Sequence, residues 1–463
     1  MPNPSVGSYQ LSRPRRSGPI IDKCAMLPIL ACIFGLIVFP MLTFFNPPDQ
    51  QTVLSGLGNR PEPRIFWPIM MALSLLLAAQ NRARFSKLTL PPHVFCLIAY
   101  LAFAGASVLW AVSPRSSLVR FVQQVMIVTS IVLPAILAVR TADIMRGVFL
   151  CFAFALILNL FFVLSGSVTM AQHGAKLMDI GYQGYFQGKN YLGECATIAM
   201  LLSMYEIRCP GWGRRAVGVI VFILAIVLIY LSDSKAALGL ALIAPFLASI
   251  TMMVRKITRI SPAIILLSIP VTWIVLSHVS HLSMERLSYM LYGDSSLTGR
   301  TIIWDFARYE IQRSPFVGWG YQSFWLVPGS PGIYAPGWVA GMPDAHNGYY
   351  DTMLELGHVG LAFLLAFILA TLHGIGRVAD RNPARALLLL SLALFLIMCN
   401  FLETWWMRGF EFLWLIFVIV VAETARYWQP LPRRAEYRPR RLKPGSPGAL
   451  PNAQTSQLRI GLP

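Results

Sequence analysis

The sequence predicts an all-α, polytopic membrane protein of about twelve transmembrane helices, with one large loop outside the membrane. Of the 463 residues, 56% are hydrophobic and only 13% are charged, whereas ordinary globular proteins have about a quarter of their residues charged. A soluble fold of this size has no interior that would hold so many apolar side chains. The apolar residues also form runs that approach the length needed to cross a bilayer core of about 30 Å, for example residues 26–45 and 217–231.

Twelve apolar runs are predicted as spans. They cover residues 26–45, 65–80, 94–111, 121–139, 147–165, 190–205, 216–231, 236–253, 261–280, 356–373, 385–402 and 409–424. The chain is thereby divided into a basic N-terminus (1–25), spans one to nine (26–280), a large loop (281–355), spans ten to twelve (356–424) and a basic tail (425–463). We expect the tail, which is rich in Pro and Arg, to be disordered and to lie against anionic membrane lipid.

The positive charges set the predicted orientation. The net charge is +18, and most of the 38 Lys and Arg residues lie in alternate connections on the side of the N-terminus. This is the positive-inside bias of a membrane protein, so the charge requires no nucleic-acid partner. The basic tail joins the same side, which favours an even number of crossings. We therefore expect a multi-pass protein of the bacterial inner membrane with both termini in the cytoplasm and the large loop in the periplasm.

The sequence predicts no metal site. Seven cysteines are scattered singly, which is typical of small apolar packing residues and gives no disulfide framework. There is no Asp-x-Asp motif and no His/Asp cluster at metal-ligand spacing. We therefore predict neither a catalytic metal nor a cofactor.

The large loop has room for structure of its own. Apolar residues recur at helical spacing in residues 301–313 and predict a short helix there. Arg300 stands at its start, and Ser314-Pro315 ends it. The rest of the loop is rich in Pro, Gly and Trp. Aromatic side chains of this kind anchor a loop at the headgroup level, and they also stack on sugar rings.

His346, at the end of this loop, is the candidate general base. Imidazole is the side chain whose ordinary pKa suits proton removal near neutrality. The alternative is a solvated loop histidine without a chemical role. Three carboxylates, Glu194, Glu355 and Glu403, lie within or near predicted spans, where carboxylates are costly and tend to be functional.

Three cations fall on the outward side, against the positive-inside trend. Lys189 begins one span, Lys235 lies in a tight turn between two spans, and Arg300 begins the short helix, where an Arg and a helix N-terminus together clamp an anion. The alternative for each is a side chain that extends to the lipid headgroups. Gathered together, these cations suit a phosphate or diphosphate ligand.

Several motifs between about residues 180 and 410 occur in a characteristic order. They are Gly188-Lys189-Asn190, Ser232-Asp-Ser234-Lys235, Gly299-Arg300-Thr-Ile-Ile-Trp304, Pro315-Phe-Val-Gly318-Trp-Gly320, His346-Asn347-Gly-Tyr-Tyr350-Asp351 and Glu355-Leu-Gly357. This order resembles the O-antigen ligase and polysaccharide polymerase superfamily, most closely its exopolysaccharide polymerases of the Wzy and ExoQ type.

The resemblance implies a metal-independent, membrane-embedded glycosyltransferase of the C type (GT-C) that acts on the periplasmic side. The donor it implies is an oligosaccharide on undecaprenyl diphosphate, transferred by single displacement with inversion because one base without a second carboxylate gives no glycosyl-enzyme. The implied catalytic residues are His346 and Arg300, and the implied substrate and diphosphate ligands are Lys189, Asn190, Lys235, Arg300 and Asn347. The family often has Arg where this chain has Lys235, and Lys lacks the bidentate fork of Arg.

Three functions stay open at this point. A polymerase would join lipid-linked repeat units into exopolysaccharide or O-antigen, with chain-length regulators and export proteins as possible partners. A ligase would transfer the glycan to lipid A core, and the acceptor decides between the two. A transporter of lipid-linked sugar would also have many helices, but we find no clear repeat between the halves of the chain. A structural scaffold would not require a loop with this His and Arg.

Overall fold

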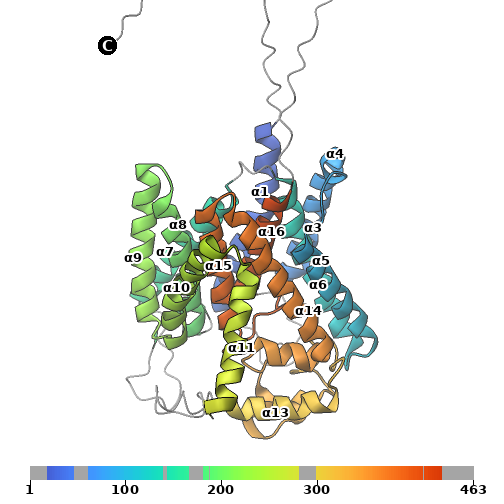
Figure 1. Ribbon diagram of the computed structural model, residues 1–463. Coiled ribbons are helices and arrows are strands. Elements are labelled where there is room, and N and C mark those ends of the chain that lie inside the picture. Colours follow the sequence, from blue (N-terminus) through green and yellow to red (C-terminus); the bar gives the residue numbers. More distant parts are fainter. Residues whose placement is uncertain are drawn as a thin grey trace, which may run out of the picture. The chain divides into compact units, whose positions relative to one another are not determined.

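The structure is a computed structural model, which describes residues 18–45, 61–138, 143–165, 181–186, 188–280, 299–409 and 411–429. These residues are mostly helical, and they contain no β-strand. The longer helices pack side by side (Figure 1) and are α1 (Gly18–Phe45), α3 (Pro61–Gln80), α5 (Pro92–Ala106), α6 (Pro114–Leu137), α7 (Ile144–Leu164), α8 (Lys189–Arg208), α9 (Trp212–Leu231), α10 (Lys235–Thr258), α11 (Pro262–Ser280), α14 (Gly348–Ala379), α15 (Pro383–Cys399) and α16 (Phe412–Trp428). The shorter α13 (Arg300–Arg313) lies across one end of the bundle (Figure 1).

Each of the twelve predicted spans coincides with one of these helices, and α13 is the short helix predicted in the large loop. Among the described residues, six helices are long and apolar enough to cross a membrane, namely α5 with its extension to Leu109, α6, α7, α9, α10 and α14. Shorter apolar helices lie in α1, α3, α11 and α15. The prediction of an all-α, multi-pass membrane protein is confirmed, while the count of twelve crossings stays a prediction.

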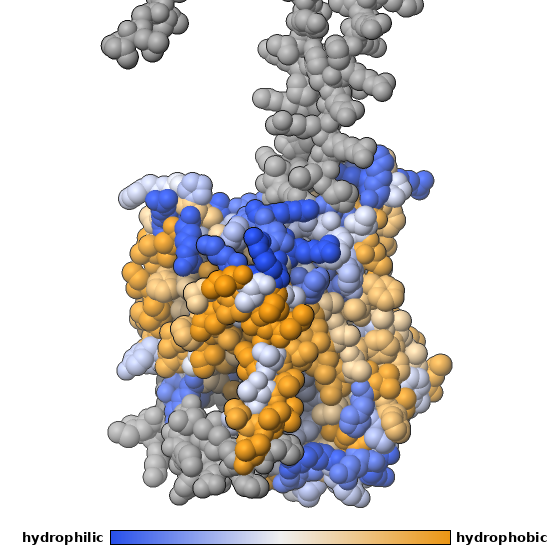
Figure 2. All heavy atoms as spheres, in the orientation of Figure 1, coloured by the Kyte–Doolittle hydropathy of each residue, from blue (hydrophilic) through white to orange (hydrophobic). Residues whose placement is uncertain are grey.

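The outer helices have the surface of a membrane protein. Large apolar side chains of α9, α10 and α11 are strongly exposed, among them Ile220, Phe246 and Ile264. Figure 2 shows apolar residues in a band across this face, with hydrophilic residues above and below the band. Because exposed aliphatic side chains on this scale are costly in water, the band marks the part of the surface that lipid covers.

Helix α16 lies inside the bundle. Every residue from Phe412 to Arg426 is buried, and Glu423 near its end pairs with Arg426 and Arg385. A helix without a lipid-facing surface can carry such charges because neighbouring helices supply their partners. The span predicted for residues 409–424 falls on this helix.

A kink in α14 fixes the large loop against the bundle. Gly357 has a left-handed φ of +64°, and a Cβ there would lie 2.2 Å from the carbonyl carbon of Phe316. The loop pairs with the opened backbone at this point. The N–H of Trp319 donates to the Leu354 carbonyl at 2.8 Å, and the N–H of Gly320 donates to the Glu355 carbonyl at 2.9 Å. The motif around Gly318 and the motif that ends at Gly357 are therefore two halves of one contact.

The structure places the end of the predicted loop in a helix. Helix α14 begins at Gly348, so residues 348–355 form its first turns, and the predicted membrane entry at residue 356 coincides with the kink. We call the end of the bundle that carries α13 the α13 end (Figure 1). Most of the predicted tail (430–463 of 425–463), most of the N-terminus (1–17) and the first part of the loop (281–298) lie outside the described residues, whereas residues 425–428 of the predicted tail form the end of α16.

Candidate functional site

The turn between α15 and α16 carries the central carboxylate of the site, Glu403. Asn400 braces this turn, because its amide oxygen accepts the N–H groups of Trp405 at 2.9 Å and Trp406 at 3.0 Å. The N–H of Gly348 donates to the carbonyls of Asn400 at 2.8 Å and Glu403 at 3.1 Å. The turn is thereby held against the start of α14, next to His346.

Glu403 accepts from three side chains that lie far apart in the sequence. One oxygen, Oε2, lies 2.9 Å from Nδ1 of His346. The other, Oε1, lies 3.0 Å from Nη2 of Arg300 and 2.9 Å from Nδ2 of Asn190. The Glu403 side chain is 14% exposed, the Arg300 side chain 20% and the His346 side chain 32%. A partly desolvated carboxylate thus gathers the predicted base and the predicted cation of the loop.

His346 is held in an orientation that suits a base. Its backbone has a left-handed φ of +48°, and its N–H donates to Oδ1 of Asp344 at 2.8 Å. A carboxylate only accepts hydrogen bonds, so the neutral ring donates from Nδ1 to Glu403 and keeps its lone pair on Nε2. The hydrogen bond that His346 donates to Glu403 raises the pKa of His346 above its ordinary value, although partial burial and Arg300 act in the opposite direction.

The turn between α9 and α10 contacts the start of α8 beside this cluster. Oγ of Ser234 donates to Oδ1 of Asn190 at 2.9 Å, and Nζ of Lys189 donates to Asp233 at 3.2 Å. Lys235 follows as the first residue of α10, with an exposed side chain. The structure therefore brings Lys189, Asn190 and the turn that carries Lys235 to the same edge of the bundle as Arg300.

Asn347 has a structural role. Its amide oxygen accepts the N–H groups of Tyr349 at 3.0 Å and Tyr350 at 3.1 Å, which caps the N-terminus of α14. Its amide nitrogen lies 3.4 Å from the carbonyl oxygen of Phe401, and the residue is 7% exposed. These contacts account for the residue as a helix cap that positions His346, while its contact with substrate stays a prediction.

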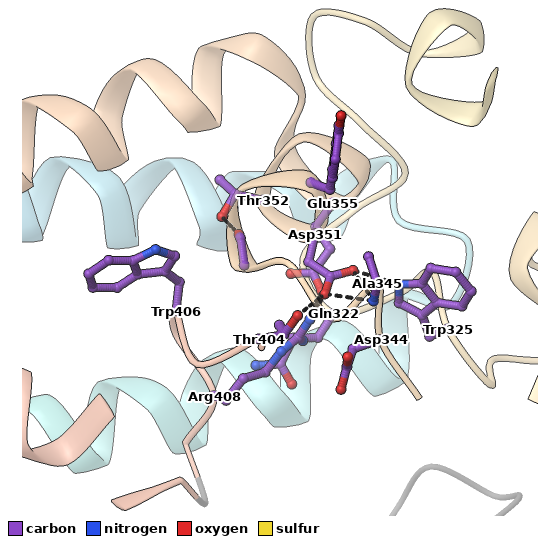
Figure 3. A network of polar contacts seen from close by, with 12 residues as sticks. Gln322, Trp325, Asp344, Ala345, Asp351, Thr352, Glu355, Thr404, Trp406 and Arg408 are labelled. Carbon is purple, nitrogen blue, oxygen red and sulfur yellow. Dashed lines mark hydrogen bonds and ion pairs between the residues drawn. The ribbon is translucent and has the colours of Figure 1, made fainter. Parts of the chain in front are cut away.

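A second network holds the peptide that precedes His346 (Figure 3). Asp351 accepts the indole N–H of Trp325 at 2.6 Å, the hydroxyl of Thr404 at 2.6 Å and the N–H of Ala345 at 3.0 Å. Arg408 closes the network, with Nη2 at 2.8 Å from Glu355 and 3.7 Å from Asp351. This buried network fixes the loop on both sides of the base.

Sequence reasoning singled out Glu403 and Glu355 only as carboxylates near spans, and it assigned no role to Asp351, Thr404 or Arg408. The available signals were weak: Asp351 lies within the motif of His346, and Arg408 is a charged residue just before the last span. His173 and His281, which the predicted spans also place on the outward side, lie outside the described residues. Within the described ranges, no group of three or more His, Cys, Asp or Glu side chains is placed to hold a metal ion.

Fold and site together define a multi-pass membrane protein with a His–carboxylate pair and several cations at one end of its helices. A model of the O-antigen ligase family matches residues 220–365, a stretch that contains Lys235, Arg300 and His346 but not Glu403. The chain is also 26% identical over 312 residues to the exopolysaccharide production protein ExoQ of Rhizobium meliloti (strain 1021), over 62% of this chain and 67% of that protein. The resemblance to the O-antigen ligase and polysaccharide polymerase superfamily is thereby confirmed.

Proposed function

We propose that this protein polymerises oligosaccharide repeat units carried on undecaprenyl diphosphate at the periplasmic face of the inner membrane. The similarities to the O-antigen ligase family and to ExoQ support a function of the ligase or polymerase type. The observation that carries the proposed glycosyl transfer is the carboxylate of Glu403, which holds the base His346 and the cation Arg300 side by side. The similarity to an exopolysaccharide production protein favours the polymerase.

The reaction is a single displacement. The hydroxyl of an acceptor sugar loses its proton to Nε2 of His346 as its oxygen bonds to the anomeric carbon of the donor. On the opposite face of that carbon, the bond to the diphosphate oxygen breaks, and its electron pair leaves with the lipid diphosphate. The configuration is inverted because no side chain forms a bond to the sugar.

The cations stabilise the leaving group. Negative charge grows on the diphosphate as the bond breaks, and preorganised donors at that position lower the barrier. Arg300 supplies a planar fork that is already oriented by Glu403. Lys189, on α8, and Lys235, on α10, add positive charge at the same edge, so that the diphosphate lies between the three. The proposal includes two further parts: the enzyme is a glycosyltransferase of the C type (GT-C), and its site faces the periplasm.

The proposal is tested by deletion of the gene in its native host and complementation with the wild type, His346→Ala or Arg300→Ala at matched membrane abundance. We expect both variants to leave single lipid-linked repeats at the outer face of the membrane and no polymer. His373→Ala and Arg308→Ala are the controls, because His373 is an exposed histidine at the far end of α14 and Arg308 an exposed arginine of α13. Polymer from both site variants would refute the assignment of the site.

A ligase is the second candidate, favoured by the family model that matches residues 220–365. In that case the deletion strain would retain long glycan chains on undecaprenyl diphosphate instead of single repeats. Repeats confined to the cytoplasmic face would indicate a transporter. The size and the location of the accumulated intermediate therefore separate the three functions.

A further inference from the structure

A cavity of about 630 Å³ lies at the α13 end between α3, α6, the large loop and the turn that carries Glu403. The charged residues of its lining are Arg64, Arg120, Asp344, Glu355, Arg408 and Glu411. Neither His346 nor the three cations assigned to the leaving group line it. The proposed reaction of the donor thus leaves this cavity without an occupant.

The cavity borders the His346–Glu403 pair. Asp344, whose carboxylate accepts the N–H of His346 at 2.8 Å, is part of its wall. So are Thr404, which follows Glu403, and Tyr191, which follows Asn190. A ligand in the cavity is therefore separated from the base by single residues, and it reaches the base from a side that Lys189 and Lys235 do not line.

The lining suits an uncharged polar ligand better than a bare phosphate. Its guanidinium groups already have partners within the protein, since Arg120 donates to the carbonyl of Gln322 and Arg408 pairs with Glu355. Three carboxylates balance the three arginines. Sugar hydroxyls both donate and accept, so they match such a mixture. Aromatic residues, among them Tyr191 and Trp325, complete the wall.

The cavity reaches the lipid-facing surface of α6. Leu118, Val119 and Val122 line it and are 49%, 49% and 39% exposed, respectively. Helix α6 is one of the helices long and apolar enough to cross a membrane, and these residues lie in the half of it nearest the α13 end. A ligand whose sugars fill the cavity can therefore keep a hydrocarbon chain in the bilayer beside α6.

We propose that this cavity, the acceptor cavity, binds the saccharide of a second lipid-linked repeat unit, whose lipid chain leaves along α6. The inference rests on the proposed function and assigns its acceptor to a site separate from that of the donor. The bound saccharide presents its hydroxyl to Nε2 of His346 past Asp344. The acceptor hydroxyl and the leaving diphosphate then lie on opposite faces of the anomeric carbon, as an in-line displacement requires.

The test counts bound substrate. Full-length His346→Ala protein is used because it should not consume its ligand. It is titrated with lipid-linked repeat unit extracted from the deletion strain, and native mass spectrometry of the complex gives the number of copies bound. We expect two copies to bind. Adding Val122→Trp, which fills the cavity with a larger side chain, should leave one copy. Adding Ile69→Trp should leave two, because Ile69 is an exposed aliphatic residue of α3 that does not line the cavity.

Each other outcome overturns the proposal. A single copy bound before Val122→Trp is introduced, or two copies afterwards, means that the cavity is not the acceptor site. Displacement of the second copy by rough lipopolysaccharide means that the acceptor is lipid A core. No binding to any variant refutes the proposed function as well. In cells, Val122→Trp should reduce polymer at least tenfold at normal membrane abundance, whereas Ile69→Trp should not.

Discussion

Replacement of Glu403 tests the central claim about the site, which is that one carboxylate serves the base and the cation at once. Glu403→Ala removes three acceptor contacts, to His346 at 2.9 Å, Arg300 at 3.0 Å and Asn190 at 2.9 Å. Glu403→Gln has nearly the same shape, but it removes the charge and leaves one acceptor oxygen. The two variants therefore separate the orientation of the ring from the electrostatic effect of the carboxylate.

The magnitude follows from these contacts. Hydrogen bonds to charged groups contribute about 1.5–3 kcal/mol each, so the loss of the two bonds to His346 and Arg300 costs about 3–6 kcal/mol when it falls on the transition state. At about 1.4 kcal/mol per tenfold change in rate, Glu403→Ala should slow polymerisation by about 10²–10⁴-fold. Glu403→Gln retains one acceptor and should lose about half of this free energy, which is roughly 10–10²-fold in rate.

The pH dependence supplies a second signature. A base must be neutral to accept a proton, and the pKa of His346 is raised by its hydrogen bond with Glu403. The rate of the wild type should therefore rise with pH through a pKa above 6.5, the ordinary value for histidine. Glu403→Gln removes the negative charge that stabilises the imidazolium of His346, so the pKa of His346 falls in this variant. The rising limb of the pH profile should then shift to lower pH in this variant.

The assay is the initial rate of polymer formation by purified variants reconstituted with lipid-linked repeat unit from the deletion strain, across about pH 5 to 9, which brackets the histidine pKa. His346→Ala and the double variant His346→Ala/Glu403→Ala complete a cycle. Because the part of the effect of Glu403 that passes through His346 is already lost in His346→Ala, the double variant should be less than multiplicatively impaired. Full multiplication of the two losses, or an unchanged rising limb in Glu403→Gln, would refute the reasoning.

Three further predictions concern the frame of the site. Gly357→Ala should unfold at lower temperature by several degrees, because the new Cβ meets the backbone of Phe316 at a positive φ; an unchanged melting temperature would show that the kink relaxes freely. Arg408→Ala should destabilise by about 3–5 kcal/mol, since Glu355 and Asp351 keep buried charge without their partner, whereas the exposed Arg308→Ala should cost less than about 1 kcal/mol in the same denaturant titration. Asn347→Asp should retain polymer, because an aspartate still caps α14, whereas Asn347→Ala should lower stability by about 0.5–2 kcal/mol; loss of polymer from a stable Asn347→Asp protein would restore a direct contact with substrate.

Much of the fold follows from local properties of the sequence. Apolar runs and the helical period of residues 301–313 depend on neighbours within a few turns, so they predict α13 and the twelve longer helices well. Both His346 and Arg300 fall in the one long loop that these runs predict, so the same local signals predict that they lie on the same side of the membrane. The limits appear where a helix has no lipid-facing surface, as in α16, or where charge lowers the hydropathy, as with Glu194 in α8. For α16 and α8, the ends of the helix and its depth in the membrane depend on the neighbouring helices.

The meeting point of the site residues could not be predicted in the same way. Glu403 contacts residues 57, 103 and 213 positions away in the chain, and no sequence period connects such distances. A carboxylate beside a span looks costly on its own, and only the packing of α8, α13 and α14 against one turn shows that its charge is balanced. Asn347 differs from Glu403 in the other direction. It lies next to the base in the sequence motif, yet its side-chain amide caps the N-terminus of α14. Proximity in sequence to a catalytic residue is therefore weak evidence for contact with substrate, because the backbone that positions the base needs hydrogen-bond partners, and neighbouring side chains supply them.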